Sequence, residues 1–229
     1  MAVLLLSVFV LLVSTLTVHC ATFANAVQKG TVTSHYIHEA SGLCASRQHP
    51  NMLYTHNDSG DTHRIYAIDG SNGQRKALIW IDGAHSTDWE DIACGPCAGG
   101  SGNCVYIADT GGNAGGDANT IYRIREPDYL NGDMHVSIDS TLQFSWDQHD
   151  CETVMVDPNG EVYVVSKVSA GHHAKFVHLP KKFETVLAQP ILYGECEDSS
   201  IQANYNITLP GTAVLPPKQI DKYPCESCE

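Results

Sequence analysis

The chain has 229 residues and a formal net charge of −13, from 26 acidic and 13 basic side chains. A nucleic-acid-binding face is basic because it must replace the counterions of the phosphates, so this balance argues against a nucleic acid as partner. Cations, basic proteins and mineral surfaces fit it better, and so does an acidic surface that only keeps the chain in solution.

The N-terminal segment is free of Asp, Glu, Lys and Arg through residue 26, and an apolar run extends from Val3 to Val18. This pattern is typical of a secretory signal peptide, so residues 1–26 are predicted to be removed on export; an uncleaved N-terminal anchor is the alternative. No later run is long enough to cross a bilayer, and the mature chain is predicted to be extracellular. Asn57 and Asn206 begin N-glycosylation sequons. Asn206 is the preferred site, because Asn57 lies in a predicted tight turn.

Nine cysteines are present, and Cys20 lies in the predicted signal peptide. The other eight are disulfide candidates: Cys44, Cys94, Cys97, Cys104, Cys151, Cys196, Cys225 and Cys228. An even number in an exported chain favours disulfides, whose pairing the sequence leaves open. The C-x-x-C pairs Cys94–Cys97 and Cys225–Cys228 also have the spacing of zinc ribbons and thiol oxidoreductases. No strand–helix pattern surrounds either pair, so structural disulfides are preferred.

Short segments rich in β-branched and aromatic residues dominate the chain after the signal, separated by Gly, Asn, Asp or Pro. In chain order they are NMLYTHN, HRIYAID, KALIWID, NCVYIAD, NTIYRIR, SIDSTLQFSW, GEVYVVSK and AKFVHLP. Such segments are typical of β-strands, and no sustained helical period competes with them. The sequence therefore predicts an all-β fold.

A repeat organises these strands. Each of three stretches begins with an acid, and these acids are Glu39, Glu90 and Glu152. Each stretch then turns through a strand with a central tyrosine; the tyrosines are Tyr54, Tyr106 and Tyr163, which lie 52 and 57 residues apart. A period of about 50 residues with several strands is the signature of a propeller blade. We predict a β-propeller or partial propeller with about three blades in residues 27–182, followed by a divergent cysteine-containing segment, 183–229. A β-sandwich with similar hairpins is the alternative.

A polar break follows the tyrosine strand of each repeat: THNDSGD, ADTGGNAGGD and SKVSAGHH. Equivalent loops of a propeller share one face, so their side chains are predicted to converge. Carboxylate oxygens suit a hard cation such as Ca²⁺. The candidate metal ligands are Glu39, Glu90, Asp109, Glu152, Asp58 and Asp91. An equally weighted alternative is that the glutamates at the repeat starts hydrogen-bond the backbone of the adjoining blade.

The stretches THNDSGDTHRIYAID, DWEDIACGP, YIADTGGNAGGDANTIYRIREP and CETVMVDPNGEVYVVSK together resemble a little-characterised family of secreted propeller-like proteins from bacteria and invertebrates. That family is similar to the six-bladed propellers of the NHL, strictosidine synthase-like and phytase-like groups. The resemblance covers residues 36 to 180 and implies a fold more than a reaction, with calcium near the axis by analogy with propeller lactonases and phytases. Six blades would need roughly 300 residues. This chain is too short for six blades, which implies a truncated form, or an open array of blades that closes with a partner.

The sequence contains no G-x-S-x-G nucleophile elbow and no phosphate-binding loop with its lysine. The preferred function is an extracellular binding or matrix protein whose expected ion is Ca²⁺. The alternative is a calcium-dependent hydrolase of lactones or phosphate esters, in which Glu39, Glu90, Asp109 and Glu152 hold a metal that activates water.

Overall fold

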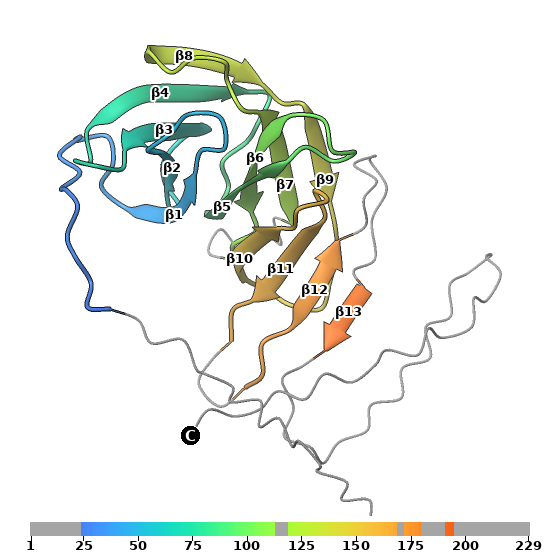
Figure 1. Cartoon of the computed structure of the whole chain (residues 1–229). Coiled ribbons are helices and arrows are strands. Elements are labelled where there is room, and N and C mark those ends of the chain that lie inside the picture. The colour runs from blue at the N-terminus through green and yellow to red at the C-terminus, as the bar shows by residue number, and fades with distance from the viewer. Residues whose placement is uncertain (1–23, 113–118, 169–171, 180–190, 195–229) are drawn as a thin grey trace, which may run out of the picture. The chain divides into compact units, whose positions relative to one another are not determined.

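The computed structural model describes residues 24–112, 119–168, 172–179 and 191–194, the last by backbone alone. The chain divides into one unit formed by Gln28–Val214 and a second formed by Met1–Val27 and Leu215–Glu229. All the described strands, which Figure 1 labels, belong to the first unit.

The first sheet is an antiparallel meander with one added strand at its edge. Its consecutive strands are β1 (Ala40–Ala45), β2 (Met52–Asn57), β3 (Arg64–Asp69) and β4 (Arg75–Asp82). β8 (Gly132–Ser137) comes from later in the chain and pairs parallel to β4. The four central residues of β3 are all buried, so both faces of this sheet are covered there.

The second and third sheets are antiparallel meanders of the same kind. The second contains β5 (Trp89–Pro96), β6 (Asn103–Asp109), β7 (Thr120–Arg125) and β9 (Ser140–Gln143). The third contains β10 (Cys151–Val156), β11 (Val162–Ser166), β12 (Phe176–Leu179) and β13 (Ile191–Gly194). The described residues form strands and loops without a helix, which confirms the all-β prediction for this part of the chain.

The three predicted repeats correspond to the three sheets. Tyr54, Tyr106 and Tyr163 each lie three residues before the end of the second strand of their sheet. Tyr54 and Tyr106 are fully buried, whereas Tyr163 is half-buried. Because side chains alternate along a strand, Tyr163 lies on the opposite face from Val162 and Val164, which belong to the core shared with the second sheet.

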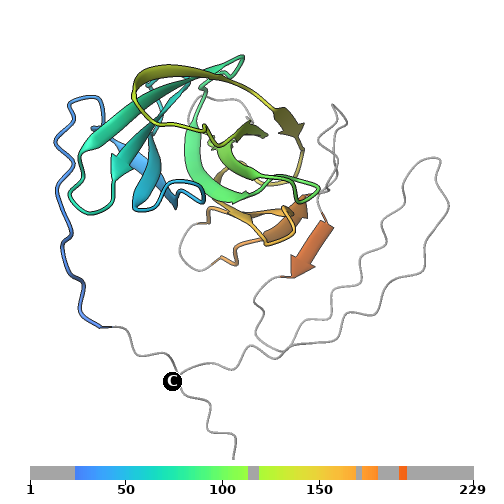
Figure 2. The same ribbon diagram turned by 45° about the horizontal axis from the view of Figure 1, so that its top comes forward.

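Two apolar cores join the sheets in sequence. Ile79 of the first sheet and Trp89 of the second belong to one core, and Leu142 of the second and Val164 of the third belong to the other. The first strands of neighbouring sheets are in contact, β1 with β5 and β5 with β10. Figure 2 shows the resulting succession from the blue and teal strands through the green to the orange ones.

Two disulfides reinforce this arrangement. Cys44 in β1 is bonded to Cys94 in β5, which links the first strands of two sheets, and Cys97 is bonded to Cys104 across the β5–β6 turn. The first C-x-x-C pair is therefore split between two disulfides and is neither a zinc site nor a dithiol. The prediction that Cys151 is paired is wrong, because its thiol is free and fully buried in the second core. Burial raises the pKa of this thiol to about 11, so it stays protonated at neutral pH.

Several predictions fall outside the described residues: those for the signal peptide through residue 23, for Asn206, and for Cys196, Cys225 and Cys228. Most of segment 183–229 lies outside as well. β13 is its described part, and it continues the third sheet past residue 182, the predicted end of the repeats. Within the described ranges, we find no helix of the length and apolarity needed to cross a bilayer.

We expect the two disulfides to contribute unequally to stability. The Cys44–Cys94 bond joins residues 50 apart and the Cys97–Cys104 bond joins residues 7 apart. Loop-closure entropy then gives about 4 kcal/mol for the first and about 2 kcal/mol for the second. Chemical denaturation of the Cys44→Ala/Cys94→Ala and Cys97→Ala/Cys104→Ala double variants measures both. Equal losses would contradict the assignment of the first bond as the link between sheets.

Candidate functional site

The same arrangement of backbone pairing and hydrogen bonding recurs where the second strand of each sheet ends, and we call it the backbone frame. The first residue of the first strand pairs with the last residue of the second strand, and the pairs are Ala40–Asn57, Trp89–Asp109 and Cys151–Ser166. The next backbone N–H donates to the carbonyl of the residue before the first strand. These donor–acceptor pairs are Asp58–Glu39, Thr110–Asp88 and Lys167–Asp150, at 2.9, 3.2 and 3.0 Å. The register is interrupted just after the first pair in all three sheets, over two residues in the first sheet and over one residue in the second and third.

This frame corrects one predicted equivalence. Two residues after each carbonyl acceptor come Ser41, Glu90 and Glu152 respectively. Glu39 is therefore two positions out of register with Glu90 and Glu152, because a match of glutamate to glutamate ignores the pairing. Ser41 takes the equivalent place in the first sheet, where its hydroxyl donates to the backbone carbonyl of Glu90 at 2.9 Å. The exposed Glu39 joins neither of the carboxylate groups described below.

In the first and second sheets, the side chain of the last residue of the second strand accepts hydrogen bonds from the backbone of the loop before the first strand. The Asn57 side-chain oxygen accepts from the backbone N–H groups of His38 and Glu39 at 3.1 and 3.2 Å. Asp109 does the same in the second sheet, where Oδ1 accepts from the N–H groups of Thr87 and Asp88 at 3.2 and 2.8 Å. Burial raises the pKa of Asp109. Its carboxylate is committed to this loop and joins neither carboxylate group, in contrast to the prediction of a metal ligand.

Asn57 is itself a buried part of the fold. It is 2% exposed, and its amide nitrogen donates to Asp61 Oδ2 at 2.6 Å and to the carbonyl of Tyr36 at 2.7 Å. The nitrogen that a glycan would modify is thus occupied in the folded chain. Asn57 and Asp61 of the first polar break therefore have a structural role in the fold.

Asp91 fills the role that was the alternative for the glutamates. Its Oδ2 accepts from the backbone N–H of Val154 in β10 at 2.8 Å, and its Oδ1 accepts from the N–H of Ile92 at 2.8 Å. Burial raises the pKa of this carboxyl group. Asp91 therefore ties the second sheet to the third and is absent from the carboxylate groups.

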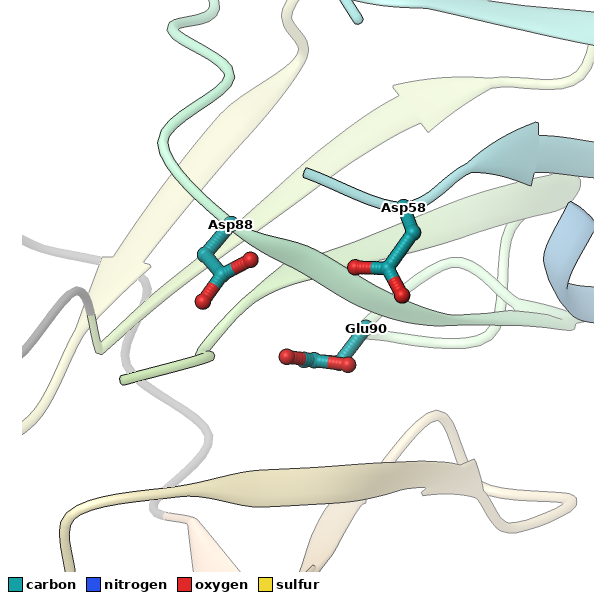
Figure 3. A group of neighbouring side chains, drawn as sticks. All are labelled: Asp58, Asp88 and Glu90. Carbon is teal, nitrogen blue, oxygen red and sulfur yellow. The ribbon is translucent and has the colours of Figure 1, made fainter. Parts of the chain in front are cut away.

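Five carboxylates from the three sheets gather beside the first strands. They form two groups that share one member: Asp58, Asp88 and Glu90, and Glu90, Asp150 and Glu152. One oxygen of each residue lies within 4.8 Å of the others in its group. We call these five residues the acidic centre. Figure 3 shows the side chains of the first group, which converge from the end of β2, the loop before β5 and β5 itself.

The acidic centre overlaps the predicted ligand set in part. Glu90, Glu152 and Asp58 are brought together as predicted, whereas Asp88 and Asp150 were missed. A signal for both was present, because Asp-x-Glu occurs at the start of the first strand in the second and third repeats. Residues two apart on a strand project from the same face, so this spacing doubles the carboxylates that face one point.

Glu90 lies at the middle of the acidic centre and is 4% exposed. Its Oε1 is buried and has no hydrogen-bond partner among the described residues. Burial raises its pKa to about 8, and the negative charges of Glu152, Asp58, Asp88 and Asp150 add to the effect. An ionised carboxylate in this position needs a compensating cation, and without one it holds a proton.

Gly111 closes the acidic centre on the side of the second polar break. A β-carbon at this position would lie 2.2 Å from Glu90 Oε1 and 2.4 Å from Asp88 Oδ2. The two carboxylates therefore occupy the space that any other residue would need. The Gly111 N–H also donates to the carbonyl of Asp88 at 3.1 Å, which fixes the glycine against the frame.

Lys167 places a positive charge beside Asp150 and Glu152 of the acidic centre. Its ammonium group pairs with Asp150 Oδ2 at 3.2 Å and with Glu152 Oε1. These hydrogen bonds raise the pKa of Lys167, and the bond to Glu152 makes the larger contribution. The Lys167 side chain is 52% exposed and that of Glu152 is 38% exposed, so the acidic centre reaches solvent here.

We expect the acidic centre to give stability an unusual pH dependence in chelator-treated protein. Glu90 releases its proton near pH 4.5 when unfolded and near pH 8 when folded. The folded chain binds more protons between these values, so the free energy of unfolding falls as the pH rises through this window, by an amount on the order of a few kcal/mol. Denaturation of the wild type and Glu90→Gln from pH 5 to 8 measures this. The variant should have a flatter profile, while Glu39→Gln should keep the wild-type slope; identical slopes in all three would refute the assignment.

Gly111→Ala should destabilise the chain by about 1–3 kcal/mol, because its methyl group overlaps two carboxylate oxygens. The same substitution in a Glu90→Ala background should cost less, since one of the two oxygens is gone. A double-mutant cycle by urea denaturation tests the coupling. Additive losses would mean that the overlap is relieved elsewhere.

No family model and no curated protein matches this chain. Among solved structures, it is similar to Kuenenia stuttgartiensis hydrazine synthase, with a TM-score of 0.40 and 12% identity over 61% of this chain and 33% of that one. It is also similar to the N-terminal domain of Chaetomium thermophilum Nup170 in a complex with Nup53, with a TM-score of 0.39 and 9% identity over 72% of this chain and 22% of that one. The chain thus spans about a third and about a fifth of these two structures.

Proposed function

We propose that this chain is an exported, acidic, propeller-like binding protein that holds a calcium ion at the acidic centre. The observation that carries the proposal is Glu90, a buried carboxylate with an unpaired oxygen among four other carboxylates. A divalent cation would remove the electrostatic penalty of this arrangement in one step.

The chemistry of the ligands favours calcium over softer ions. The acidic centre offers carboxylate oxygens, and neither group contains a cysteine or histidine. Calcium takes six to eight oxygens with flexible geometry, whereas zinc and copper prefer nitrogen and sulfur. Carboxylates that come from three different sheets suit an ion with flexible coordination geometry.

The topology supports the propeller-like part of the proposal. Each sheet contains four antiparallel strands, to which β8 is added in the first sheet, and the first strands β1, β5 and β10 contact one another in sequence. First strands that face a common axis are the arrangement of propeller blades. Binding sites near that axis are formed by residues from several blades, as the acidic centre is.

Export and an extracellular partner rest on independent features. Two disulfides are typical of an oxidising compartment, and the apolar N-terminus has the pattern of a signal peptide. The net charge of −13 favours a cationic ligand or matrix component. We infer that this acidic surface binds such a partner.

A calcium-dependent hydrolase is the second candidate, because the acidic centre reaches solvent at Glu152 and Lys167. A metal held by Glu90 would lower the pKa of bound water and polarise an ester or lactone. Lys167 would attract an anionic substrate to the same opening. A binding protein, in contrast, requires no open coordination position.

Calorimetric titration of the chelator-treated protein with Ca²⁺ tests the proposed site. We expect saturable binding and a higher melting temperature in excess calcium than in chelator. Glu90→Gln should weaken binding at least tenfold, because it removes the central charge. Glu39→Gln is the matched control: it removes the same charge from a neighbouring acid outside both groups, and it should bind as the wild type does.

The absence of binding heat and of a melting shift would refute the calcium site. Equal weakening by Glu90→Gln and Glu39→Gln would point to general charge attraction. A screen of lactones and phosphate esters with the calcium-loaded protein separates the two candidates: turnover that Glu90→Gln abolishes would favour the hydrolase.

A further inference from the structure

The two carboxylate groups of the acidic centre differ in their surroundings. In the described part of the chain, no lysine or arginine pairs with Asp58 or Glu90. The second group is different, because the ammonium group of Lys167 contacts both Asp150 and Glu152. One side of Glu90 thus faces further negative charge, while the other faces carboxylates that already have a cation.

The recurring frame explains how this difference arises. Asp58, Thr110 and Lys167 occupy the same place in the three sheets, immediately after the second strand. Each is fixed by its backbone N–H, so its side chain projects from an equivalent point. In the first sheet that point carries a carboxylate, and in the third it carries an ammonium group.

The Lys167 ammonium group, which contacts carboxylate oxygens of Asp150 and Glu152, would compete with a metal ion for these oxygens. A divalent ion held by Glu90, Asp150 and Glu152 would lie within a few ångströms of the Lys167 nitrogen, and the two positive charges would repel each other. The lysine would then have to leave two salt bridges. The group formed by Asp58, Asp88 and Glu90 includes no such competitor for Asp58 and Glu90.

We propose that Lys167 is a tethered cation that restricts the acidic centre to one divalent ion, held by Asp58, Asp88 and Glu90, and that removal of Lys167 opens a second ion position at Glu90, Asp150 and Glu152. The inference rests on the proposed calcium site. It adds the position of the ion, the stoichiometry and the residue that sets it. Lys167 acts through Asp150 and Glu152 and is not itself a ligand.

Calorimetric titration with Ca²⁺ of full-length wild type and Lys167→Met tests the inference. The wild type should bind one ion and Lys167→Met two, while Lys167→Arg should restore one because it keeps the charge. Lys175→Met is the matched control, since it removes a lysine that directly precedes β12 and pairs with Asp147 outside the acidic centre, and it should bind one ion. Adding Glu152→Gln to Lys167→Met should return the stoichiometry to one, which locates the second ion.

The outcomes separate this inference from the function on which it rests. One ion in both the wild type and Lys167→Met would overturn the role of Lys167 and leave the calcium site standing. Two ions in the wild type would overturn it as well. No binding in the wild type would refute the calcium site and the inference together. Because the Lys167 side chain is half-exposed, Lys167→Met should fold, and thermal melting in chelator checks this.

Discussion

Contact between the first strands of neighbouring sheets holds this structure together. β1 lies against β5 and β5 against β10, and each contact is reinforced by a specific bond. Between β1 and β5 these are the Cys44–Cys94 disulfide and the Ser41 hydroxyl. Between β5 and β10 the Asp91 carboxylate accepts from the backbone of β10. The apolar cores behind these strands then fill the space that opens between the sheets.

The same contact forces acidic side chains together. Asp-x-Glu at the start of β5 and β10 directs carboxylates toward the point where the strands approach, and Asp58 arrives there from the end of β2. Two like charges 4 Å apart repel by about 4 kcal/mol at an effective dielectric constant of 20. A fold that needed only packing would place apolar or hydrogen-bonded residues here, as it does with Asp91 and Asp109. Glu90 instead places a buried carboxylate oxygen here that has no hydrogen-bond partner among the described residues.

Much of the architecture could be predicted from the sequence, because strand propensity and turn residues are local properties. The three tyrosines marked the second strands of all three sheets, and the all-β character followed from the strand patterns. The third sheet's last strand, β13, was missed because its four residues carry no repeat signal and depend on pairing with β12. Whether the sheets belong to a complete ring is not encoded in local pattern at all.

The acidic centre was less predictable, since it depends on register and on which acids the backbone uses for itself. Glu90 was identified from its place at the start of a repeat, but Glu39 was matched to it by residue type although the pairing places it two positions away. Asp109 and Asp91 have the same chemistry as the ligand candidates, and only their hydrogen bonds reveal structural roles. The sequence alone does not distinguish an acid whose carboxylate accepts hydrogen bonds from the backbone from an acid that faces other carboxylates, because the hydrogen-bond partners of the backbone N–H groups are known only from the structure.

The recurring backbone frame fixes the residue after each second strand by its main chain. The bond after each second strand uses backbone atoms alone, so it places no demand on the side chain of that residue. The three sheets carry an aspartate, a threonine and a lysine at this one position, and the frame is the same in all of them. Substitutions at Asp58 and Lys167 can therefore alter which ligands are attracted while the backbone bond stays the same. Thr110 differs, because its buried hydroxyl donates to the Cys151 carbonyl at 2.9 Å and so connects the second sheet to the third.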